Sequence, residues 1–345
     1  MSEAQPPDRP WLAHYSPHVP AALPAPALTA IDQFRASVAR APTSPAIHYF
    51  DTTLSYGDLD RLSSALAAAL CRSGVWRGDR VALDLQNMPQ FWIALLASWK
   101  AGAIVVPLNP MFKAAELEYH LNDSGAAALI SLESRYATLG HEVVPRTSVR
   151  LVITTCELDL LHDDRRPAVL AGVDRARLPG TDDLLALCEQ YAGAADPQTA
   201  VELHDTAPLT YTSGTTGQPK GAMNSHSNVA ANAEVYRTWA NLGPGDVIIG
   251  MAPLFHITGL VSHLATAGLA GLPLILAYRF DAGELLRLIE RWRGSFTVAA
   301  ITAFVALMNH PSIHERDLSS LRKAYSGGAP IPPALVERFQ SLTGT

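Results

Sequence analysis

Apolar residues in the first third of the chain alternate between the spacing of helices and the spacing of buried strands. From Tyr56 to Ser73 they recur every three or four residues, which predicts a helix, and Gly74 ends the pattern. The apolar run at 80–85 predicts a buried strand, a helix is expected over 89–101, and 104–107 predicts another strand. This alternation favours parallel sheets that are covered by helices on both faces.

The same alternation returns in the second half of the chain. The residues between the halves, 157–198, are charged and weakly periodic apart from one expected helix near 182–191, so we interpret them as a junction between two lobes. Further helices are expected over 28–39, 226–239, 284–293, 304–310 and 333–342, and further strands near Leu209 and over 247–251, 274–276 and 297–300.

The predicted fold class is α/β, with two lobes of mostly parallel sheet flanked by helices. The chain has 345 residues, which exceeds the roughly 250–300 residues at which a single core stops growing. We expect an irregular Ala/Pro-rich arm over 1–27, a first lobe over 28–205 and a second lobe over 206–345. This division allows the start of the first lobe to pack on the second lobe.

One stretch, 258–277, is nearly as apolar as a membrane span and close to the roughly 20 residues that a span requires. His263, Gly268, Gly271 and Pro273 interrupt it. We therefore interpret it as a buried helix followed by a buried strand and expect no integral membrane span.

Composition and charge narrow the classes of partner. Hydrophobic residues make up 48% of the chain and charged residues 17%, which is typical of an ordinary globular protein. Lys and Arg total 26 against 32 Asp and Glu, so the net charge of −6 gives no overall attraction for nucleic acid or anionic lipid. An anionic substrate would need a local pocket of donors.

The cysteines and the N-terminus indicate a cytoplasmic protein. Cys71, Cys156 and Cys188 are odd in number and far apart, without the paired spacing of a zinc site or a disulfide framework, so we expect reduced thiols. The N-terminus has no positively charged segment followed by an apolar run, which disfavours secretion.

The sequence disfavours two other kinds of site. Neither Ser213 nor Ser326 stands in the G-x-S-x-G pattern of a serine hydrolase. His310 and His314 have the spacing of metal ligands on a helix, but Pro311 lies between them and no H-E-x-x-H is formed. An exposed turn is the better interpretation there.

The segment most informative about chemistry is Leu209–Gly221, with the sequence LTYTSGTTGQPKG. Its glycines let the backbone N–H groups approach a ligand, while its hydroxyl groups and Lys220 add donors and a positive charge, so the loop could wrap a polyphosphate. It is not the loop of the P-loop NTPases, because Pro219 precedes Lys220 and glycine follows it. A flexible surface loop has the same composition, so composition alone leaves both interpretations open.

The order of residues in this segment resembles the phosphate-binding signature of the adenylate-forming superfamily, which includes acyl-CoA synthetases, luciferases and peptide-synthetase adenylation domains. Segments 54–59 and 99–109 resemble the first two conserved boxes of that family. Residues 252–259 are similar to the aromatic box of acyl-CoA and aryl-CoA ligases, and 325–330 look like the segment that lines the adenine and acyl sites. From about residue 28 onward, the chain most resembles the front portion of an AMP-forming acyl-CoA synthetase, the large N-terminal domain of the adenylate-forming fold.

The resemblance implies a reaction and a set of roles. A carboxylate attacks the α-phosphorus of ATP, pyrophosphate leaves, and coenzyme A, as co-substrate, takes the acyl group, with Mg²⁺ on the phosphates. His256 is implied beside the substrate carboxylate, as the catalytic residue that helps gate the pocket. No residue of this chain is assigned as a metal ligand. The residues implied to bind the nucleotide are Thr212, Ser213, Gly214, Thr215, Thr216, Gly217 and Lys220 at the phosphates and Gly327, Gly328 and Ala329 along the adenine.

The family pattern continues beyond Thr345 with a Thr-Glu pair that holds Mg²⁺, a Thr-Gly-Asp that binds the ribose, and a mobile domain with the catalytic lysine. None of these motifs occurs in the sequence. We therefore expect an incomplete second lobe, no C-terminal mobile domain, and a truncated fragment that is inactive or binds nucleotide weakly.

The substrate expected from the resemblance is a fatty or aryl carboxylic acid. Small residues at 299, 300 and 303 beside Phe304 are compatible with an apolar acyl pocket and equally with plain core. Two alternatives stay open: an adenylation domain for amino or acyl acids without transfer to coenzyme A, and a non-catalytic fragment that binds nucleotide or a protein partner. The amino-acid alternative is disfavoured because its aromatic box usually carries an aspartate where this chain has Pro-Leu-Phe-His. An oligomer is possible.

Overall fold

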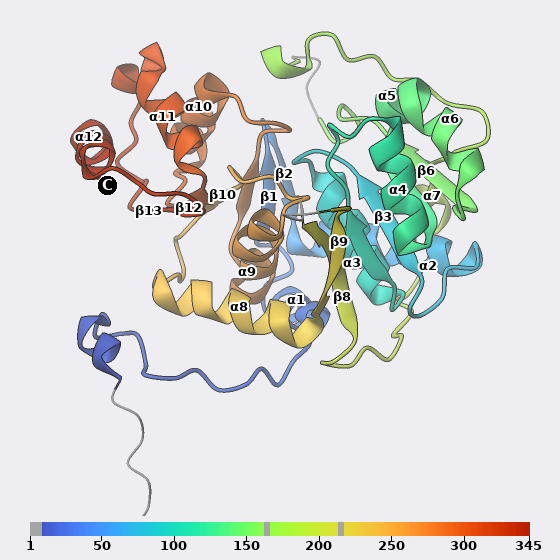
Figure 1. Cartoon of the computed structure of the whole chain (residues 1–345), viewed down its shortest axis with the longest axis horizontal. Coiled ribbons are helices and arrows are strands. Elements are labelled where there is room, and N and C mark those ends of the chain that lie inside the picture. Colours follow the sequence, from blue (N-terminus) through green and yellow to red (C-terminus); the bar gives the residue numbers. More distant parts are fainter. Residues whose placement is uncertain (1–8, 162–165, 213–216) are drawn as a thin grey trace, which may run out of the picture.

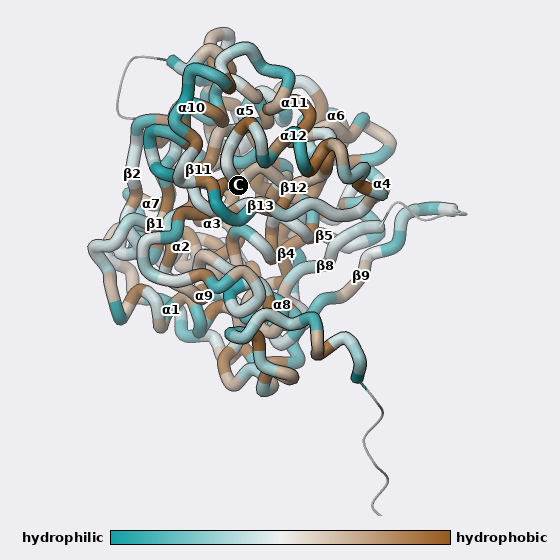
Figure 2. Tube along the Cα trace, turned by 90° about the vertical axis from the view of Figure 1, so that its left-hand side faces the viewer, coloured by the Kyte–Doolittle hydropathy of each residue, from teal (hydrophilic) through white to brown (hydrophobic). Residues whose placement is uncertain are grey.

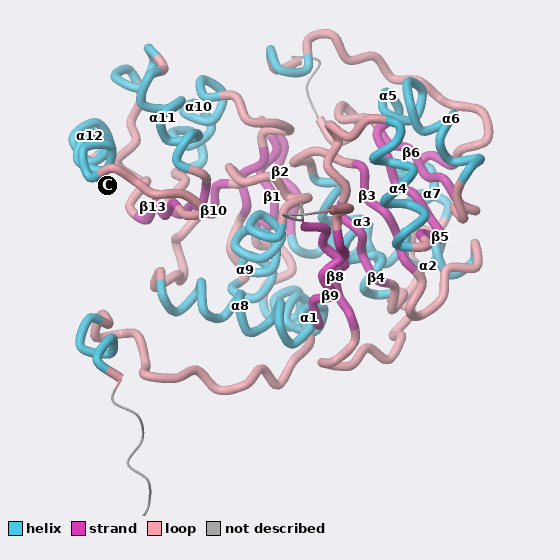
Figure 3. The backbone as a smooth tube through the Cα atoms, viewed as in Figure 1, coloured by secondary structure: helices cyan, strands magenta, loops and turns pink. Residues whose placement is uncertain are grey.

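The computed structural model describes residues 9–161, 166–212 and 217–345, whose strands form two mostly parallel sheets flanked by helices (Figures 1 and 3). The first sheet has seven strands in the order β7-β6-β5-β3-β4-β8-β9, and only its β8–β9 pair is antiparallel. The second has six strands in the order β13-β12-β10-β11-β1-β2, and only its β1–β2 pair is antiparallel. The predicted fold class is confirmed.

The strands are short, and those in the middle of each sheet are buried. The first sheet contains β3 (Arg80–Asp84), β4 (Ile104–Pro107), β5 (Ala126–Leu132), β6 (Leu151–Thr155), β7 (Asp182–Asp183), β8 (Thr206–Thr212) and β9 (Lys220–Ser225). The second contains β1 (Pro45–Tyr49), β2 (Thr52–Ser55), β10 (Ile248–Ile249), β11 (Leu274–Leu276), β12 (Phe296–Ala299) and β13 (Lys323–Ser326).

The helices cover both sheets, and the hydrophobic residues gather between them and the strands (Figure 2). The α-helices are α1 (Ala30–Arg40), α2 (Tyr56–Arg72), α3 (Pro89–Lys100), α4 (Ala114–Ser124), α5 (Glu133–Arg135), α6 (His141–Val143), α7 (Leu184–Gln190), α8 (His226–Trp239), α9 (Thr266–Ala270), α10 (Ala282–Trp292), α11 (Ile301–Asn309) and α12 (Pro333–Thr343). Helix α3 is buried along its whole length, so it lies inside the molecule.

Side-chain caps explain why some predicted helices begin where they do. Helix α8 spans the predicted residues 226–239 because Ser225 and Asn228 form a capping box, each side chain bonding the other's backbone N–H. Helix α2 begins with the same arrangement between Ser55 and Asp58. Helix α4 ends at Ser124, because the following Gly125 adopts φ 60°, a conformation that favours glycine and stops the helix.

The domain boundary expected after residue 205 does not separate the two sheets. Strands β8 and β9 complete the first sheet, where Pro208 of β8 pairs with Val105 of β4. Conversely, β1 and β2 precede the rest of the first lobe in sequence but lie in the second sheet, where β1 pairs with β11. The division into sheets therefore differs from the boundary after residue 205, and the place of β1 and β2 is the packing of the chain's start on the second lobe that the expected scheme allowed. The pairing of a strand depends on partners distant in sequence, which local periodicity does not report.

The apolar stretch 258–277 is a buried helix followed by a buried strand, as predicted. It contains the π-helical turn Gly259–Ala265, helix α9 and strand β11, and Gly271 ends the helix with φ 70°. None of the helices in the described part of the chain combines the length and apolar character needed to cross a bilayer.

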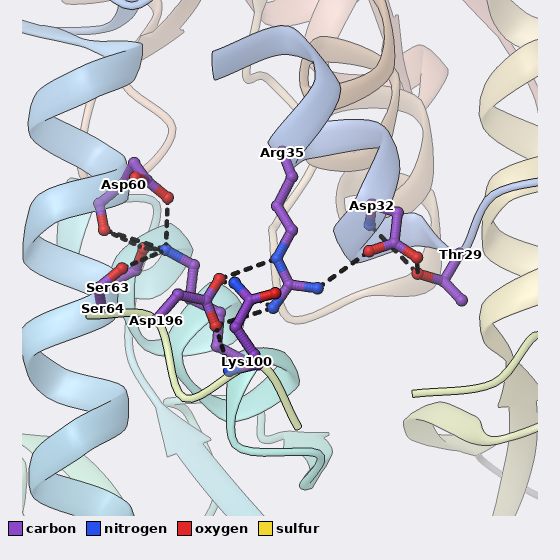
Figure 4. A network of polar contacts seen from close by, with 9 residues as sticks. Thr29, Asp32, Arg35, Asp60, Ser63, Ser64, Lys100 and Asp196 are labelled. Atoms are coloured by element: carbon purple, nitrogen blue, oxygen red, sulfur yellow. Dashed lines mark hydrogen bonds and ion pairs between the residues drawn. The ribbon is translucent and has the colours of Figure 1, made fainter. Parts of the chain in front are cut away.

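A polar network fixes α1 to the first lobe (Figure 4). The Lys100 ammonium group has no exposed surface and donates to Asp60 Oδ1 at 2.6 Å and to two serine hydroxyl groups of α2 at 2.8 and 2.9 Å. Arg35 of α1 makes two 2.8 Å bonds to the carboxylate of Asp196, in the segment before β8. Burial lowers the pKa of Lys100, and the hydrogen bonds compensate part of its desolvation.

The described part of the expected arm contains a short 3-10 helix, Pro10–His14, and otherwise irregular chain. Its Tyr15 ring packs edge-on against Trp239 at the end of α8, with ring centroids 5.2 Å apart. Residues 1–8 of the arm lie outside the described residues.

The three cysteines and the rejected histidine pair agree with the sequence interpretation. Cys71, Cys156 and Cys188 are free thiols, and the last two are buried. His310 bonds the hydroxyl group of Ser312 at 2.7 Å, whereas His314 is exposed on the next turn.

Candidate functional site

The Leu209–Gly221 segment forms the end of an antiparallel hairpin, which we call the β8–β9 hairpin. Thr212 pairs with Lys220 and Tyr211 with Gly221, so the loop leaves the sheet between Thr212 and Lys220. Both of these residues are exposed, as is Gly217. Ser213, Gly214, Thr215 and Thr216 lie outside the described residues.

Packing inside the hairpin favours glycine at 221. A Cβ atom at this position would lie 2.9 Å from Leu209 Cδ1 and 3.1 Å from its Cγ, so the leucine side chain would have to shift. At Gly217, in contrast, an added Cβ would meet nothing within 4 Å. Packing of the hairpin therefore explains the glycine at 221 but does not explain the glycine at 217.

Helix α4 holds both ends of the hairpin loop. The Tyr119 hydroxyl group donates to the carbonyl of Pro219 at 2.7 Å, and the Tyr211 hydroxyl group donates to Asp123 Oδ2 at 2.6 Å. Burial and the bond to Asp123 raise the pKa of Tyr211, so its hydroxyl group keeps its proton.

His120 fills the space between α4 and the hairpin. It is 3% exposed, and its ring stacks on Phe112 and meets Tyr211 edge-on, with both centroid distances 4.4 Å. Its Nδ1 donates to the carbonyl of Glu116 at 2.7 Å, which leaves the Nε2 lone pair as the acceptor of the neutral ring.

His256 lies on the segment that follows β10, and its side chain is exposed. Its Nδ1 accepts the backbone N–H of Thr258 at 3.1 Å, so the proton of the neutral ring is on Nε2 and can be donated to a ligand. The segment turns sharply at Gly259, where a Cβ atom would lie 2.2 Å from the carbonyl oxygen of Pro253. Glycine is needed there for the approach of two backbone segments.

A buried asparagine positions the His256 segment from the other sheet. Asn87 follows β3, is 6% exposed, and donates from Nδ2 to the carbonyls of Gly250 and Ala252, both at 3.0 Å. Its Oδ1 accepts the N–H of Leu254 at 2.8 Å, and its backbone exchanges two hydrogen bonds with Tyr278. One side chain thus satisfies three buried backbone groups that precede His256.

A cavity of about 780 Å³ joins the hairpin to the His256 segment. It is within the range of roughly 300–1,000 Å³ typical of small-molecule sites. Its walls are α4 with the loop before it, residues 210–212 and 218–219 of the hairpin, and Phe255, His256 and Ile257. The donors Thr212 and His256 share this cavity, and Lys220 adjoins Pro219 at its edge, so the donor set suits an anionic ligand.

The Gly327–Ala329 turn is not part of this cavity wall. It lies between β13 and α12 and is exposed, and Gly328 has φ 82°, which only glycine adopts readily. The structure thus brings together the hairpin and His256 and leaves the predicted adenine segment apart from them.

The described residues bring together no group of three His, Cys, Asp or Glu side chains that could hold a metal ion.

The pattern of the AMP-binding enzyme family matches residues 34–345 of the chain. The chain belongs to the AMP-binding enzyme family. This confirms the resemblance stated from the sequence, and the hairpin and the His256 segment both fall within the matched residues.

Relatives within the family include acyl-CoA and aryl-CoA ligases. The chain is 31% identical to a long-chain-fatty-acid–CoA ligase of Bacillus subtilis (strain 168), over 97% of this chain and 61% of the relative. It is 33% identical to a feruloyl-CoA synthase of Amycolatopsis sp, over 86% of this chain and 54% of that protein. The crystal structure of a long-chain-fatty-acid-CoA ligase from Archaeoglobus fulgidus superposes with a TM-score of 0.79 at 25% identity, covering 96% of this chain and 63% of that one. The chain thus spans about three fifths of the length of the ligases it matches.

Sequence reasoning missed several residues that shape the site. An asparagine directly after a predicted parallel strand is a signal that could have drawn attention to Asn87, because ligands and lobe contacts concentrate at that edge of a sheet. Tyr119, Asp123 and Tyr211 give no comparable signal, since their importance depends on the packing of α4 against the hairpin.

Proposed function

We propose that this chain provides the ATP-binding and acid-binding part of an AMP-forming acid–thiol ligase. In this reaction a fatty or aryl carboxylate attacks the α-phosphorus of ATP, pyrophosphate leaves and an acyl-adenylate forms. The thiol of coenzyme A then takes the acyl group, and AMP leaves. The observation that carries the proposal is that the β8–β9 hairpin and His256 share one cavity of about 780 Å³. The names of the matched ligases support the substrate class.

The proposed roles follow from charge. A carboxylate and a triphosphate repel each other, and negative charge builds on the departing pyrophosphate, so donors that are already in place lower the barrier. Thr212, Gly217 and Lys220, with the undescribed residues 213–216, would bind the β- and γ-phosphates. His256 would donate from Nε2 near the carboxylate, because its Nδ1 is occupied by Thr258. Mg²⁺ would enter with ATP.

The adenine-binding residues, the acceptor of the acyl group and the cellular location stay predictions. Gly327, Gly328 and Ala329 are proposed to lie along the adenine, which requires the nucleotide to extend from the cavity toward β13. The coenzyme A acceptor and the cytoplasmic location are likewise proposals. Phe255 and Ile257 give the cavity an apolar side, which fits an alkyl or aryl group better than the charged ammonium of an amino acid.

The test is acid-dependent exchange of radiolabelled pyrophosphate into ATP, run on residues 1–345 and on the protein encoded by the whole reading frame. We expect fatty or aromatic acids, and no amino acid, to support exchange by the latter, and His256→Ala to reduce it. Residues 1–345 alone are expected to bind Mg·ATP weakly and to form no detectable thioester. Exchange driven only by amino acids would replace the proposal with an amino-acid adenylation domain.

A further inference from the structure

Both ends of the hairpin loop are hydrogen-bonded to one face of a single helix. Tyr119 and Asp123 are four residues apart on α4, which places them one above the other on the same face. Tyr119 contacts Pro219, directly before Lys220, and Asp123 contacts Tyr211, directly before Thr212. The two contacts therefore bracket the loop that the proposed function assigns to phosphate binding.

We propose that Tyr119 and Asp123 form a clamp that sets the separation and orientation of the two ends of the phosphate-binding loop. They are positioning residues, because they act on ATP through the loop and do not touch it. The inference rests on the proposed function. It assigns helix α4 to the phosphate site, although α4 lies nearly a hundred residues earlier in the chain than the loop it holds.

Helix α4 is itself held firmly enough to serve as a reference. Its first turn is capped by a 2.9 Å bond from the Lys113 N–H to Glu116. At its other end the Arg80 guanidinium donates to the carbonyls of Ser124 and Gly125, both at 2.7 Å. Leu117 and Leu121, on its inner face, are buried against the first sheet. A helix fixed at both ends and along its inner face can transmit a fixed spacing to the loop.

The contacts themselves favour positioning over bulk stability. Tyr119 is half-buried and Asp123 is exposed, so neither supplies much of the core. The ladder between β8 and β9 and the packing of Leu209 hold the hairpin without them. What the two hydroxyl groups add is directional restraint at Pro219 and Tyr211, and a restraint that is present before binding reduces the entropy lost on binding.

The experiment compares Tyr119→Phe, Tyr211→Phe and their double variant with wild type. Phenylalanine keeps the ring packing and removes only the hydroxyl group. Tyr136→Phe is the matched control, because Tyr136 packs on the same small core and its hydroxyl group has no hydrogen-bond partner among the described residues. Dissociation constants of Mg·ATP, Mg·pyrophosphate and AMP are measured by calorimetric titration of the protein encoded by the whole reading frame, and each variant's melting temperature is recorded.

We expect each single variant to bind Mg·ATP and Mg·pyrophosphate about fivefold more weakly, and the double variant about 25-fold, since one hydrogen bond contributes on the order of a fivefold change in affinity. Binding of AMP, which lacks the β- and γ-phosphates, should change less than twofold. Tyr136→Phe should leave all three constants unchanged.

The contrasting results separate this inference from the proposed function. If wild type binds neither ATP nor pyrophosphate, the proposed function fails and the clamp fails with it. If wild type binds ATP and the variants bind it equally well, or weaken ATP and AMP to the same extent while the melting temperature falls, then the two residues have a structural role only and the clamp is refuted while the proposed function stands.

Discussion

The β8–β9 hairpin and the Gly327–Ala329 turn both carry glycine-containing motifs, and both follow a strand of a mostly parallel sheet. The hairpin is held by side chains from α4 at both ends of its loop, and the packing of Leu209 favours glycine at 221. The turn after β13 is exposed, and a Cβ atom at Gly327 or Gly328 would meet nothing within 4 Å. Strand β13 also has a single neighbour in its sheet among the described residues, β12.

Motifs of similar composition can therefore have unequal tertiary support. At the hairpin, contacts with α4 and with Leu209 explain part of the motif's residue order without any ligand. At the turn, the conformation of Gly328 explains one glycine, and an added Cβ at Gly327 would meet no described atom within 4 Å. Packing of the described residues therefore does not explain the glycine at 327, whereas the proposed contact with the nucleotide would.

Acidification should destabilise the protein strongly through a buried histidine next to the hairpin. His226, directly after β9, is 2% exposed, and burial lowers its pKa to about 4 although Asp205 and Asp32 act in the opposite direction. Below pH 6.5 the unfolded chain takes up a proton that the folded protein does not take up until about pH 4. The free energy of unfolding should therefore fall by up to about 3 kcal/mol for this group as pH decreases from about 6.5 to 4.

Urea unfolding between pH 7.5 and 4.5 measures this loss. His48 and His263 have pKa values lowered to about 4 by burial and should add similar losses. His226→Gln should make the free energy of unfolding less dependent on pH, by the uptake of about one proton on unfolding. His314→Gln, at an exposed position, should leave this dependence unchanged. Parallel curves for wild type and His226→Gln would show that this histidine is not kept neutral by the fold.

The end of the second sheet should respond at lower pH. Burial acts to raise the pKa of Asp246, but its bonds from Lys323, Gly243 and Ser295 lower it below its usual value. The stability that this carboxylate contributes is present above its unfolded pKa of roughly 4 and is lost only as pH falls below that. The loss from Asp246 should thus appear at lower pH than the losses from His226, His48 and His263.

One lysine at each of the two sites, Lys220 at the hairpin and Lys323 in β13, is replaced by alanine. Lys220→Ala should weaken Mg·ATP binding ten- to hundredfold, about 1.5–3 kcal/mol, because one charge-assisted contact is lost, with the free energy of unfolding unchanged. Lys323→Ala should do the opposite, because Lys323 donates to buried Asp246 and to the carbonyl of Asn241, both at 2.8 Å. Its loss should cost about 1–3 kcal/mol of stability without affecting ATP.

Calorimetry for binding and chemical denaturation for stability test both lysines in one set of samples. An unchanged ATP affinity in Lys220→Ala would remove this residue from the site. A destabilised Lys220→Ala would mean that the lysine serves the hairpin itself.

The smallest effects concern the glycines. Gly221→Ala should destabilise by about 1 kcal/mol because of the contact with Leu209, and Gly328→Ala by about 1–2 kcal/mol because alanine resists φ 82°. Gly327→Ala should be neutral in stability and is therefore the cleanest probe of the adenine assignment. If Gly327→Ala leaves ATP binding unchanged as well, the turn loses its proposed role.

The sequence predicted local elements well where caps and periodicity agree. Helix α8 and strands β4 and β11 have the expected bounds, since a capping box, a following proline or a short apolar run marks their ends. Strands β1, β2 and β9 were not expected. Their residues carry no distinctive alternation, and the ladders that define them connect distant segments.

The candidate site was predicted in part. The order of motif residues pointed to the hairpin and to His256, and the structure places both on one cavity. Asn87, which fixes the backbone before His256, and the α4 clamp were not predicted. A hydrogen bond between residues a hundred or more positions apart leaves no trace in one sequence, because its partners are brought together only by the completed fold.

The pairing of β1 with β11 has a consequence for how the protein is made. Ile47 lies beside Leu274, so roughly 230 residues must leave the ribosome after β1 before this strand meets its parallel neighbour, β11. At about 5–20 residues per second, this delay is on the order of ten to fifty seconds. During that interval the β1–β2 pair has one edge unpaired and exposed to other nascent chains. We expect slowed translation between residues 55 and 274 to increase the protein's dependence on chaperones during synthesis.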